Sequence, residues 1–473
     1  MESLIEAASR LSQGETSSEA IVREALDRVA EREEELHAFL TLLPESALSE
    51  ATASDLRRQA GSSLGLFDGI PWAAKDNLLT EGVRTTAASR ILGDYLPPYS
   101  STAVRRLEAT GAILIGKTNL DEFAMGSSTE YSAFGPSRNP VDPSRVPGGS
   151  SGGSAVAVAA GMCHYALGSE TGGSVRQPAA FCGIVGLKPS YGRVSRYGLI
   201  AFASSLDQIG TLTRDVGDAA AVLGAIAGED PMDQTASTAP VPDYLLAVRQ
   251  GGRGLSFGVP PEYLAEGVAD EVRAEVERAA GLLERAGLTR RDVSLPHTGY
   301  ALDAYYIIAP AEASSNLARF DGMRYGPRAD AEELVDAYRR SRGQGFGPEV
   351  KRRILLGTYV LSAGYYDTYY LQAQRLRTLL REEFLRAFAQ VDVLLTPTTP
   401  TTAFRLGENT QDPLAMYMAD ALTIPANLAG LPAISVPGRP VGGLPVGLQV
   451  MAPPLREDLM LRAAATLEEV VSR

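Results

Sequence analysis

Two short segments rich in glycine and serine are the part of the sequence best suited to chemistry. They span residues 148–154 and 168–178. Glycine lets a backbone adopt unusual dihedral angles and approach a ligand closely, and both segments place serine hydroxyls among glycines. A flexible linker and a phosphate-binding loop are the alternatives. Strand and helix patterns flank the segments closely, unlike a linker, and neither ends in the Gly-Lys-Ser/Thr of a phosphate loop.

A serine hydroxyl must lose its proton to act as a nucleophile, so these segments need a base. The three histidines are poorly placed: His164 lies in an apolar run, His37 in a charged helix and His297 in a loop after a proline. Lysine can serve instead where burial keeps it neutral, because burial lowers its pKa. Lys75 follows the uncharged residues 69–74, and this setting makes it the best candidate, with a surface lysine as the alternative.

Lys75, residues 148–154 and residues 172–178 follow one another in this order, and together they resemble the amidase signature family. The resemblance implies an α/β fold with a Ser-Ser-Lys triad. Ser174 would be the nucleophile, Ser150 the bridging serine and Lys75 the base. It also implies a cis peptide bond before Ser150.

Other segments resemble the glutamine-hydrolysing subunits of tRNA-dependent amidotransferases within this family. They are residues 116–130, 312–317, 349–354, 362–366 and 412–417. In such subunits an arginine and an aspartate hold free glutamine, and these positions fall here on Arg353 and Asp420. Arg352 remains an alternative to Arg353. One cation and one anion suit glutamine because it carries an α-carboxylate and an α-ammonium group.

The resemblance implies further site residues around the nucleophile. The oxyanion hole would consist of backbone N–H groups, those of Thr171, Gly172, Gly173 and Ser174. Met125 and Ser151 would also contact the substrate. Position 170 is Glu where the family more often has Asp, which we interpret as a small repacking of the turn. Cys182 is interpreted as a core thiol.

The implied activity is hydrolysis of glutamine through an ester on Ser174, with release of ammonia. The ammonia would be used by partner subunits B and C of a heterotrimer, which convert Glu-tRNA(Gln) to Gln-tRNA(Gln). ATP and Mg²⁺ would bind one of these partners, so this chain itself is expected to need no cofactor and no metal. The alternative hypotheses are a stand-alone amidase acting on other amides and a non-catalytic scaffold within a complex.

Composition narrows the classes of function. The formal net charge of −13 argues against binding of nucleic acid by the chain's own surface, because phosphate binding needs clustered Lys and Arg. With three histidines and two cysteines, zinc sites, iron–sulfur clusters and a disulfide framework are nearly excluded. The most apolar stretch, residues 155–167, is shorter than the roughly 18 residues that span a bilayer. Few thiols and no visible export signal predict a cytoplasmic protein without membrane contact.

Residues 111–118 match the phosphate-loop pattern G-x-x-x-x-G-K-[ST], but we interpret the match as misleading. The four middle residues are Ala, Ile, Leu and Ile, which read as a strand, whereas a phosphate loop follows a strand. The sequence therefore predicts a buried strand that ends at Gly116, with Lys117 and Thr118 on the turn beyond it.

The surrounding elements predict how these residues are positioned. Residues 1–60 read as an N-terminal helical segment, and Thr16 has the spacing of a capping box with Glu19. Residues 70–210 alternate short apolar runs with helical patterns and form the catalytic core of a mixed sheet with helices on both faces. Further strands are expected at 112–115, 183–186, 255–259, 391–395, 433–436 and 446–451, and helices at 270–286 and 366–389. Residues 300–425 carry the glutamine-pocket segments, and without a repeat or long linker the whole chain, 1–473, is expected to form one domain.

Overall fold

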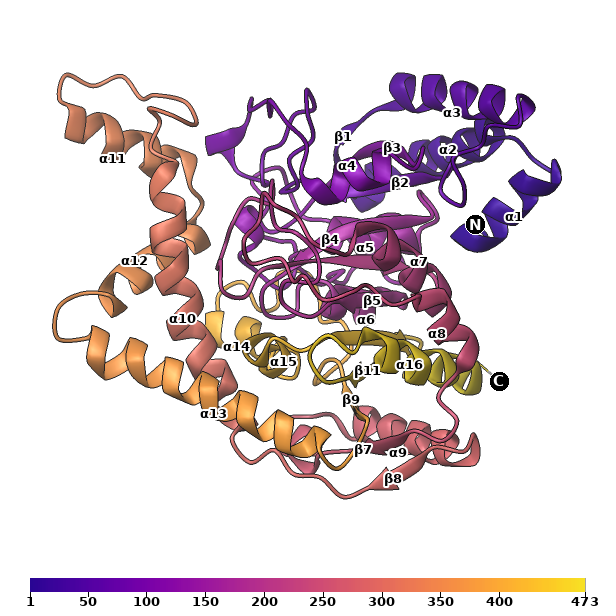
Figure 1. Ribbon diagram of the computed structural model, residues 1–473. Coiled ribbons are helices and arrows are strands. Elements are labelled where there is room, and N and C mark those ends of the chain that lie inside the picture. Colours follow the sequence, from indigo (N-terminus) through magenta and orange to yellow (C-terminus); the bar gives the residue numbers. More distant parts are fainter. Residues whose placement is uncertain (473) are drawn as a thin grey trace.

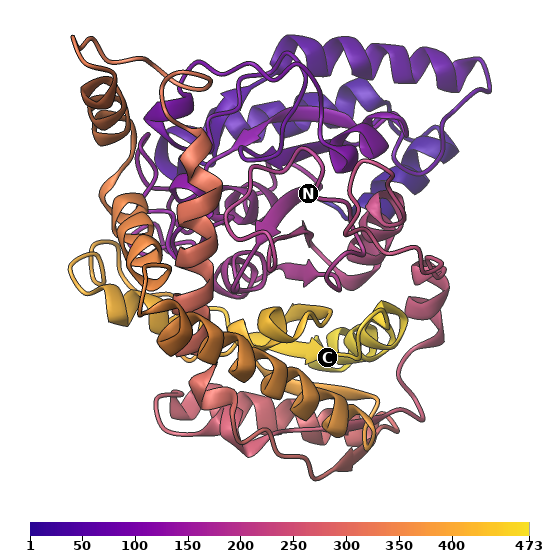
Figure 2. The same ribbon diagram turned by 60° about the vertical axis from the view of Figure 1, so that its left-hand side comes forward.

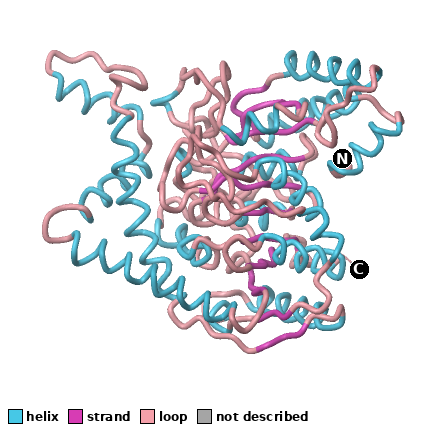
Figure 3. The backbone as a smooth tube through the Cα atoms, viewed as in Figure 1, coloured by secondary structure: helices cyan, strands magenta, loops and turns pink. Residues whose placement is uncertain are grey.

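The computed structural model describes residues 1–472 and contains one sheet of eleven strands. Figure 3 shows these strands stacked through the middle of the molecule, with helices around them. In chain order the strands are β1 (Phe39–Leu42), β2 (Pro71–Lys75), β3 (Ile113–Thr118), β4 (Tyr165–Glu170), β5 (Val185–Lys188), β6 (Gln208–Thr213), β7 (Ser256–Gly258), β8 (Thr289–Arg291), β9 (Val393–Pro397), β10 (Ala433–Pro437) and β11 (Gly447–Met451).

Most helices lie on the two faces of this sheet or along one side of it (Figure 1). The α-helices are α1 (Leu4–Gln13), α2 (Ser18–Leu36), α3 (Pro44–Gln59), α4 (Thr102–Glu108), α5 (Gly152–Ala159), α6 (Arg176–Cys182), α7 (Val216–Ile226), α8 (Tyr244–Gln250), α9 (Asp270–Arg285), α10 (Ala301–Asn316), α11 (Leu334–Gly345), α12 (Pro348–Val360), α13 (Leu371–Phe388), α14 (Pro413–Met418), α15 (Ile424–Ala429) and α16 (Glu457–Val471). Short 3₁₀ turns occur at Arg90–Leu92, Glu122–Ala124, Pro261–Leu264, Thr298–Tyr300 and Leu317–Arg319, and a π-helical turn at Tyr366–Tyr370.

The sheet is mixed. Its strand order is β1-β3-β2-β4-β6-β5-β10-β11-β9-β7-β8. Neighbours β3, β2 and β4 run parallel, as do β9, β7 and β8, and the other neighbouring pairs are antiparallel. Strands β2 and β4 are neighbours and run parallel, so their C-terminal ends lie on the same side of the sheet. Lys75 ends β2, and the second glycine–serine segment begins within β4 and continues past its end.

Helices cover both faces of the sheet, as the alternation along β2 shows. Trp72 and Ala74 belong to one core cluster and Ala73 to another, because successive residues of a strand point to opposite faces. Helices α4, α7, α8, α9 and α16 contribute to the first cluster, and α2, α3, α5 and α6 contribute to the second. The predicted α/β fold, a large mixed sheet with helices on both faces, is confirmed.

The N-terminal segment differs from its prediction in two ways. It forms α1 to α3, but it also supplies β1, which pairs antiparallel with β3 at the edge of the sheet. The cap of α2 is Ser17, whose side chain accepts a hydrogen bond from the Ala20 N–H, so the predicted capping box at Thr16 is wrong by one residue. A complete capping box lies instead on α1, between Ser3 and Glu6.

Lys117 and Thr118 also differ from expectation, because β3 continues through them and both are fully buried. Lys117 Nζ donates to the Leu78 carbonyl and to Thr85 Oγ1, each at 2.8 Å, and it forms an ion pair with Asp76. These contacts satisfy the ammonium group inside the protein. The expected turn after Gly116 is therefore wrong, while the interpretation of the motif as a buried strand is confirmed.

Helices α10 to α13 form a flank beside the sheet, which Figure 2 brings to the front. Helices α10, α12 and α13 share one apolar cluster that also includes Phe123 and Met125, close in sequence to the predicted site. This flank therefore closes one side of the catalytic region. Among residues 1–472 no helix is both long and apolar enough to cross a membrane.

Candidate active site

Lys75 is the last residue of β2, a strand whose five residues are all buried. Its Nζ donates hydrogen bonds to Ser150 Oγ at 2.7 Å, to Ser151 Oγ at 2.9 Å and to the Ser169 carbonyl at 3.1 Å. The side chain has no solvent exposure. The ammonium group is thus held by three acceptors, two of which are serine hydroxyls from the first glycine–serine segment.

Burial lowers the pKa of Lys75 to about 7, and the negative charges of Asp121, Asp207 and Glu170 act in the opposite direction. Near neutral pH a large fraction of such a lysine is uncharged. A neutral amine has a free lone pair, so Lys75 can accept a proton from the Ser150 hydroxyl.

Ser150 follows a cis peptide bond between Gly149 and Ser150, as the family resemblance implied. Glycine is required at two positions of this loop. Gly148 has a φ of +83°, and a Cβ at Gly149 would lie 2.1 Å from Asp121 Oδ2. The Gly149 N–H donates to Gln177 Oε1 at 2.9 Å, which ties the loop to the start of α6.

Ser174 lies in the loop between β4 and α6. Its carbonyl accepts a hydrogen bond from the Ser151 N–H at 3.0 Å, which joins the two glycine–serine segments. Behind the loop, Glu170 accepts hydrogen bonds from the N–H groups of Val175 and Arg176, each at 3.1 Å, and forms a fully buried ion pair with the Arg176 guanidinium. Burial would raise the pKa of Glu170, but Arg176 lowers it below its usual range, so the carboxylate is charged.

The loop from Thr171 to Ser174 carries backbone N–H groups that have no partner within the described part of the chain. Within residues 1–472 no hydrogen bond uses the N–H groups of Gly172, Gly173 or Ser174. The Thr171 hydroxyl donates to Asp207 Oδ1 at 2.6 Å and anchors the start of the loop. Unpaired N–H groups beside a serine can stabilise a developing oxyanion, although the assignment of the oxyanion hole to Thr171–Ser174 stays a prediction.

Two glycines of this loop are closely packed. A Cβ at Gly172 would lie 2.8 Å from the Tyr305 ring, and one at Gly173 would lie 2.3 Å from Thr423 Oγ1 and 2.7 Å from Asp420 Oδ1. Glycine is therefore needed here for close approach. The contacts also place Asp420 directly beside the loop that carries Ser174.

Arg353 projects from α12 into an aromatic enclosure and is 3% exposed. Its Nε donates to Glu349 Oε1 at 2.8 Å. The centre of the guanidinium lies 5.3 Å from the ring centres of Tyr306 and Tyr417 and 5.5 Å from that of Phe202. Rings and carboxylate together hold the planar group in one orientation, which suits recognition of a carboxylate.

The structure separates the two arginines that the sequence left as alternatives. Arg352 points outward, with a side chain that is 46% exposed, and pairs with Glu349 from the solvent side. Arg353 is buried on the inner side of the same helix. This difference favours Arg353 as the carboxylate ligand, and the assignment stays a prediction.

Asp420 follows α14 and is 6% exposed. Its Oδ2 accepts a hydrogen bond from the Ser127 hydroxyl, while Oδ1 is buried without a partner among the described residues. Burial raises the pKa of Asp420 to about 7; the Ser127 hydrogen bond and Arg353 lower it. A buried acceptor without a partner is costly, so Oδ1 is suited to receive a donor from a ligand.

The two remaining predicted substrate contacts are buried. Met125 has no exposure and packs in the apolar cluster shared with α10. The Ser151 hydroxyl accepts from Lys75 Nζ and donates to the Ser169 carbonyl at 3.1 Å, so its hydrogen-bonding capacity is used within the protein. The structure brings Ser151 to Lys75, and contact of either residue with substrate stays a prediction.

Several residues that complete the arrangement were not predicted from the sequence. Ser127 and Asp121 lie inside a segment that carried the family resemblance, and Glu349 begins another. Gln177 Nε2 donates to the Ser127 carbonyl at 2.9 Å and so links the Asp420 side of the site to the Ser150 loop. Only the segments, and not the individual contacts, could be recognised from the sequence.

The histidines and cysteines take no part in this arrangement. Burial lowers the pKa of His164 to about 3, so it is neutral and lies in the core. Cys163 and Cys182 are buried free thiols, as expected for Cys182. Among residues 1–472 no cluster of His, Cys, Asp and Glu is arranged to hold a metal ion.

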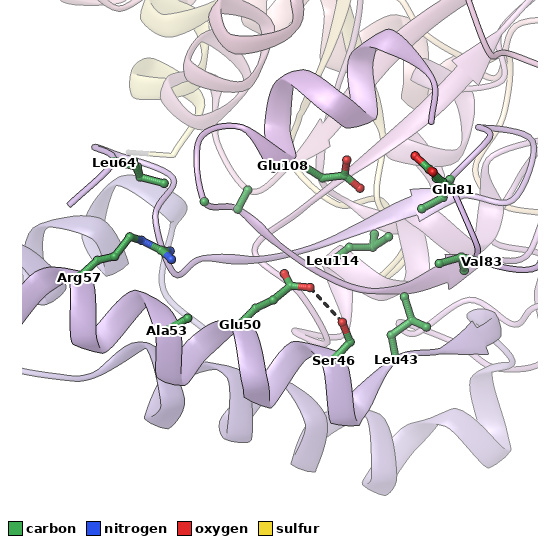
Figure 4. A pocket seen from close by; sticks show the side chains of 13 residues that line it. Leu43, Ser46, Glu50, Ala53, Arg57, Leu64, Glu81, Val83, Glu108 and Leu114 are labelled. Carbon is green, nitrogen blue, oxygen red and sulfur yellow. Dashed lines mark hydrogen bonds between the residues drawn. The ribbon is translucent and has the colours of Figure 1, made fainter. Parts of the chain in front are cut away.

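A separate cavity of about 450 Å³ lies between α3 and the edge of the sheet (Figure 4). Glu50, Glu81 and Glu108 surround it, with Arg57 at one side. No triad residue lines it. It is therefore distinct from the candidate active site.

Comparison with known proteins identifies the family. The family model described as Amidase matches residues 20–461. The A subunit of glutamyl-tRNA(Gln) amidotransferase from Moorella thermoacetica is 58% identical over 459 residues, which cover 97% of this chain and 94% of the relative. The protein of the same description from Geobacillus thermodenitrificans is 56% identical, covering 97% of this chain and 95% of the relative.

Solved structures agree with the sequence relatives. The crystal structure of the A subunit of glutamyl-tRNA(Gln) amidotransferase from Thermotoga maritima is 44% identical, with a TM-score of 0.82 over 98% of this chain and 94% of that chain. The peptide amidase from Stenotrophomonas maltophilia is 32% identical, with a TM-score of 0.83 over 99% of this chain and 97% of that chain. The resemblance inferred from the sequence is thus confirmed, and the chain belongs to the amidase family.

Proposed function

We propose that this chain is the glutamine-hydrolysing subunit of a tRNA-dependent amidotransferase. It releases ammonia from glutamine, and the ammonia converts Glu-tRNA(Gln) to Gln-tRNA(Gln) on partner subunits B and C of a heterotrimer. The observation that carries the substrate choice is a pair of buried groups of opposite charge, Arg353 and Asp420, of which Asp420 lies beside the Ser174 loop. Relatives named as the A subunit of this amidotransferase support the same choice.

The charges of glutamine complement this pair. Its α-carboxylate would pair with the outer guanidinium nitrogens of Arg353, because Glu349 already occupies Nε. Its α-ammonium would donate to the partnerless Oδ1 of Asp420. The positive charge would also lower the pKa of Asp420 and keep it ionised. Held at both ends of its α-carbon, glutamine would extend its side-chain amide toward Ser174.

Acyl transfer follows from the proposed roles of the triad. Ser174 Oγ attacks the amide carbon, and its proton passes to Ser150, which gives its own proton to neutral Lys75. The 2.7 Å contact from Lys75 Nζ to Ser150 Oγ supports this relay. Backbone N–H groups of residues 171–174 receive the oxyanion, and such donors are each worth roughly 3–4 kcal/mol. The proton then returns through Ser150 to the leaving nitrogen, which departs as ammonia.

Hydrolysis completes the cycle. A γ-glutamyl ester remains on Ser174, and water attacks it while Ser150 and Lys75 accept the water's proton. Glutamate leaves and Ser174 recovers its hydrogen. ATP and Mg²⁺ would act on one of the partners, so the proposal needs no cofactor in this chain, and its place of action is the cytoplasm, where tRNA is charged.

Ammonia release from glutamine tests the proposal, measured for the full-length chain alone and together with subunits B and C. Ser174→Ala should abolish release, and mass spectrometry of the rapidly quenched wild type should show a glutamyl adduct on Ser174. Ser12→Ala, at an exposed position on α1, is the matched control and should retain activity. Preference for aryl, fatty or peptide amides would instead establish a stand-alone amidase, and absence of any hydrolysis in the complex would establish a scaffold.

A further inference from the structure

We propose that Asp121 is a positioning residue for the triad, which fixes the loop that carries Ser150 and places a buried negative charge near Lys75. This inference rests on the proposed function because it assigns a residue to the same reaction. Asp121 does not contact the substrate in the proposed mechanism and acts through Ser150 and Lys75.

Asp121 organises two loops at once. Its N–H donates to the Ser150 carbonyl at 3.3 Å. Its carboxylate accepts from the N–H groups of Thr129 at 2.9 Å, Tyr131 at 3.1 Å and Ser128 at 3.3 Å. The side chain has no solvent exposure. A single carboxylate thus binds the turn at residues 128–131 while its backbone holds the residue after the cis peptide bond.

Two glycines show how tightly this carboxylate is enclosed. A Cβ at Gly149 would lie 2.1 Å from Asp121 Oδ2, and one at Gly126 would lie 2.4 Å from Asp121 Cγ. Both positions therefore require glycine because of Asp121. The backbone beside Ser150 is shaped around the carboxylate, so a change at Asp121 should move the bridging serine.

Three buried carboxylates, those of Asp121, Asp207 and Glu170, act electrostatically on Lys75, and they differ in their other partners. Glu170 is paired with Arg176, and the charge of one compensates the other. Asp207 binds the Thr171 hydroxyl and backbone N–H groups before β6. Asp121 is held by backbone N–H groups, and its charge opposes the effect of burial on the pKa of Lys75.

The interaction works in both directions. Burial raises the pKa of Asp121 to about 6, whereas its backbone hydrogen bonds and Lys75 lower it. Asp76, the residue after the end of β2, is a further buried carboxylate, and it forms an ion pair with Lys117. Above about pH 6, Asp121 is therefore ionised and favours the protonated form of Lys75.

The test measures the pH dependence of nucleophile activation without relying on glutamine. An alkyl fluorophosphonate reacts with an activated serine: the Ser174 oxygen bonds to phosphorus, fluoride leaves, and the serine proton passes to the base. The labelling rate of the full-length protein between pH 6 and 9 gives the midpoint for loss of the Lys75 proton. Glutamine hydrolysis by the complex with subunits B and C is measured in parallel.

Asp121→Asn removes the charge and places an NH₂ group against backbone donors. We expect its labelling midpoint to move to lower pH by at least about 0.5 unit and its plateau rate to fall about tenfold or more. Asp121→Glu keeps the charge in a space without room for a methylene, so the rate should fall while the midpoint stays near that of the wild type. The Glu variant also tests the positioning role if the Asn variant does not fold.

Asp218→Asn is the matched control. Asp218 lies on α7 and is equally buried. Its carboxylate also accepts hydrogen bonds from backbone N–H groups, those of Leu4 and Ile5 at the start of α1. The labelling rate of Asp218→Asn should have the same pH midpoint as that of the wild type. An unchanged midpoint in Asp121→Asn would overturn the electrostatic role, and full activity of Asp121→Glu would overturn the positioning role. If the wild type is labelled at Ser174 but does not hydrolyse glutamine, the proposed function fails while the test of Asp121 still decides.

Discussion

Glu349 and Arg353, one helical turn apart on α12, form a buried ion pair with 2.8 Å between Glu349 Oε1 and Arg353 Nε. The same carboxylate oxygen accepts a hydrogen bond from the Tyr417 hydroxyl at 2.9 Å. This arrangement uses one guanidinium nitrogen for structure, and the other two form no hydrogen bond within residues 1–472. The orientation of Arg353 is therefore fixed before a substrate arrives.

Arg353→Lys should weaken glutamine binding. Lysine keeps the charge but loses the planar fork, and a hydrogen bond to a charged group contributes about 1.5–3 kcal/mol, so KM should rise roughly tenfold to a hundredfold. Steady-state ammonia release measures the change. Arg352→Lys, on the exposed side of α12, should leave KM within about twofold. An equal rise in KM for Arg353→Lys and Arg352→Lys would show that neither arginine is the specific ligand of the glutamine α-carboxylate.

Asp420→Asn should separate recognition of the ammonium group from recognition of the rest of the substrate. The amide is nearly isosteric but uncharged, so KM for glutamine should rise about tenfold. Glutaramic acid, which lacks the α-amino group, should bind the wild type and the variant about equally well. If Asp420→Asn weakens the binding of glutamine and of glutaramic acid to the same extent, Asp420 Oδ1 is not the acceptor of the ammonium group.

The rate of glutamine hydrolysis should depend on the protonation of Lys75. Its pKa is lowered to about 7, and only the neutral form accepts a proton, so kcat should rise with pH and level off above about pH 8. Lys75→Met should lower kcat by roughly 10²–10⁴-fold and remove this dependence. Lys351→Met, an exposed lysine on α12, is the control. A profile with the same midpoint in Lys75→Met would exclude Lys75 as the base.

Glu170→Gln should destabilise the fold. It leaves the Arg176 guanidinium buried without its counter-charge, which costs about 3–5 kcal/mol. Because the pKa of Glu170 is lowered in the folded state, its contribution is present above the unfolded pKa and is lost as the pH falls through the folded pKa.

Urea unfolding at pH 7 measures the change in the free energy of unfolding. Glu277→Gln provides the comparison, because its partner Arg290 lies on the surface and such exposed pairs contribute about 0–1 kcal/mol. Equal losses in the two variants would contradict the special role of the buried pair behind the Ser174 loop.

ATP should not bind at residues 111–118. Lys117 Nζ is fully buried and engaged by Leu78, Thr85 and Asp76, so it cannot reach a phosphate. Addition of MgATP to the isolated chain should leave its unfolding temperature unchanged. A rise in that temperature that Lys117→Ala removes would restore the phosphate-loop interpretation.

Apolar strands could be predicted from the sequence more readily than those that serve the site. The runs at 433–436 and 446–451 became β10 and β11, since a strand buried on both faces is continuously apolar. Strands β2 and β4 were not singled out. They end in Lys75 and in Ser169 with Glu170, and these buried polar residues interrupt the apolar pattern because they act in the site.

In the candidate site, too, local sequence patterns predicted some features and not others. Glycines and serines close together in sequence made the proposed triad recognisable. The contact between Ser127 and Asp420 joins residues 293 positions apart, and no local pattern predicts it. Lys117 was expected on a turn because the strand was expected to end at Gly116. Lysine is rarely buried, and the tertiary contacts with Asp76 and the Leu78 carbonyl explain its position in the strand.

The position of β10 affects how the protein is made. This strand is among the last to be synthesised, yet it pairs with β5 in the middle of the sheet. A ribosome adds about 5–20 residues per second, so the first six strands emerge long before residue 433. During that interval the edge of β5 presents unpaired backbone groups that another nascent chain can bind. A product that stops before β10 would contain Lys75, Ser150 and Ser174 and still be prone to aggregate.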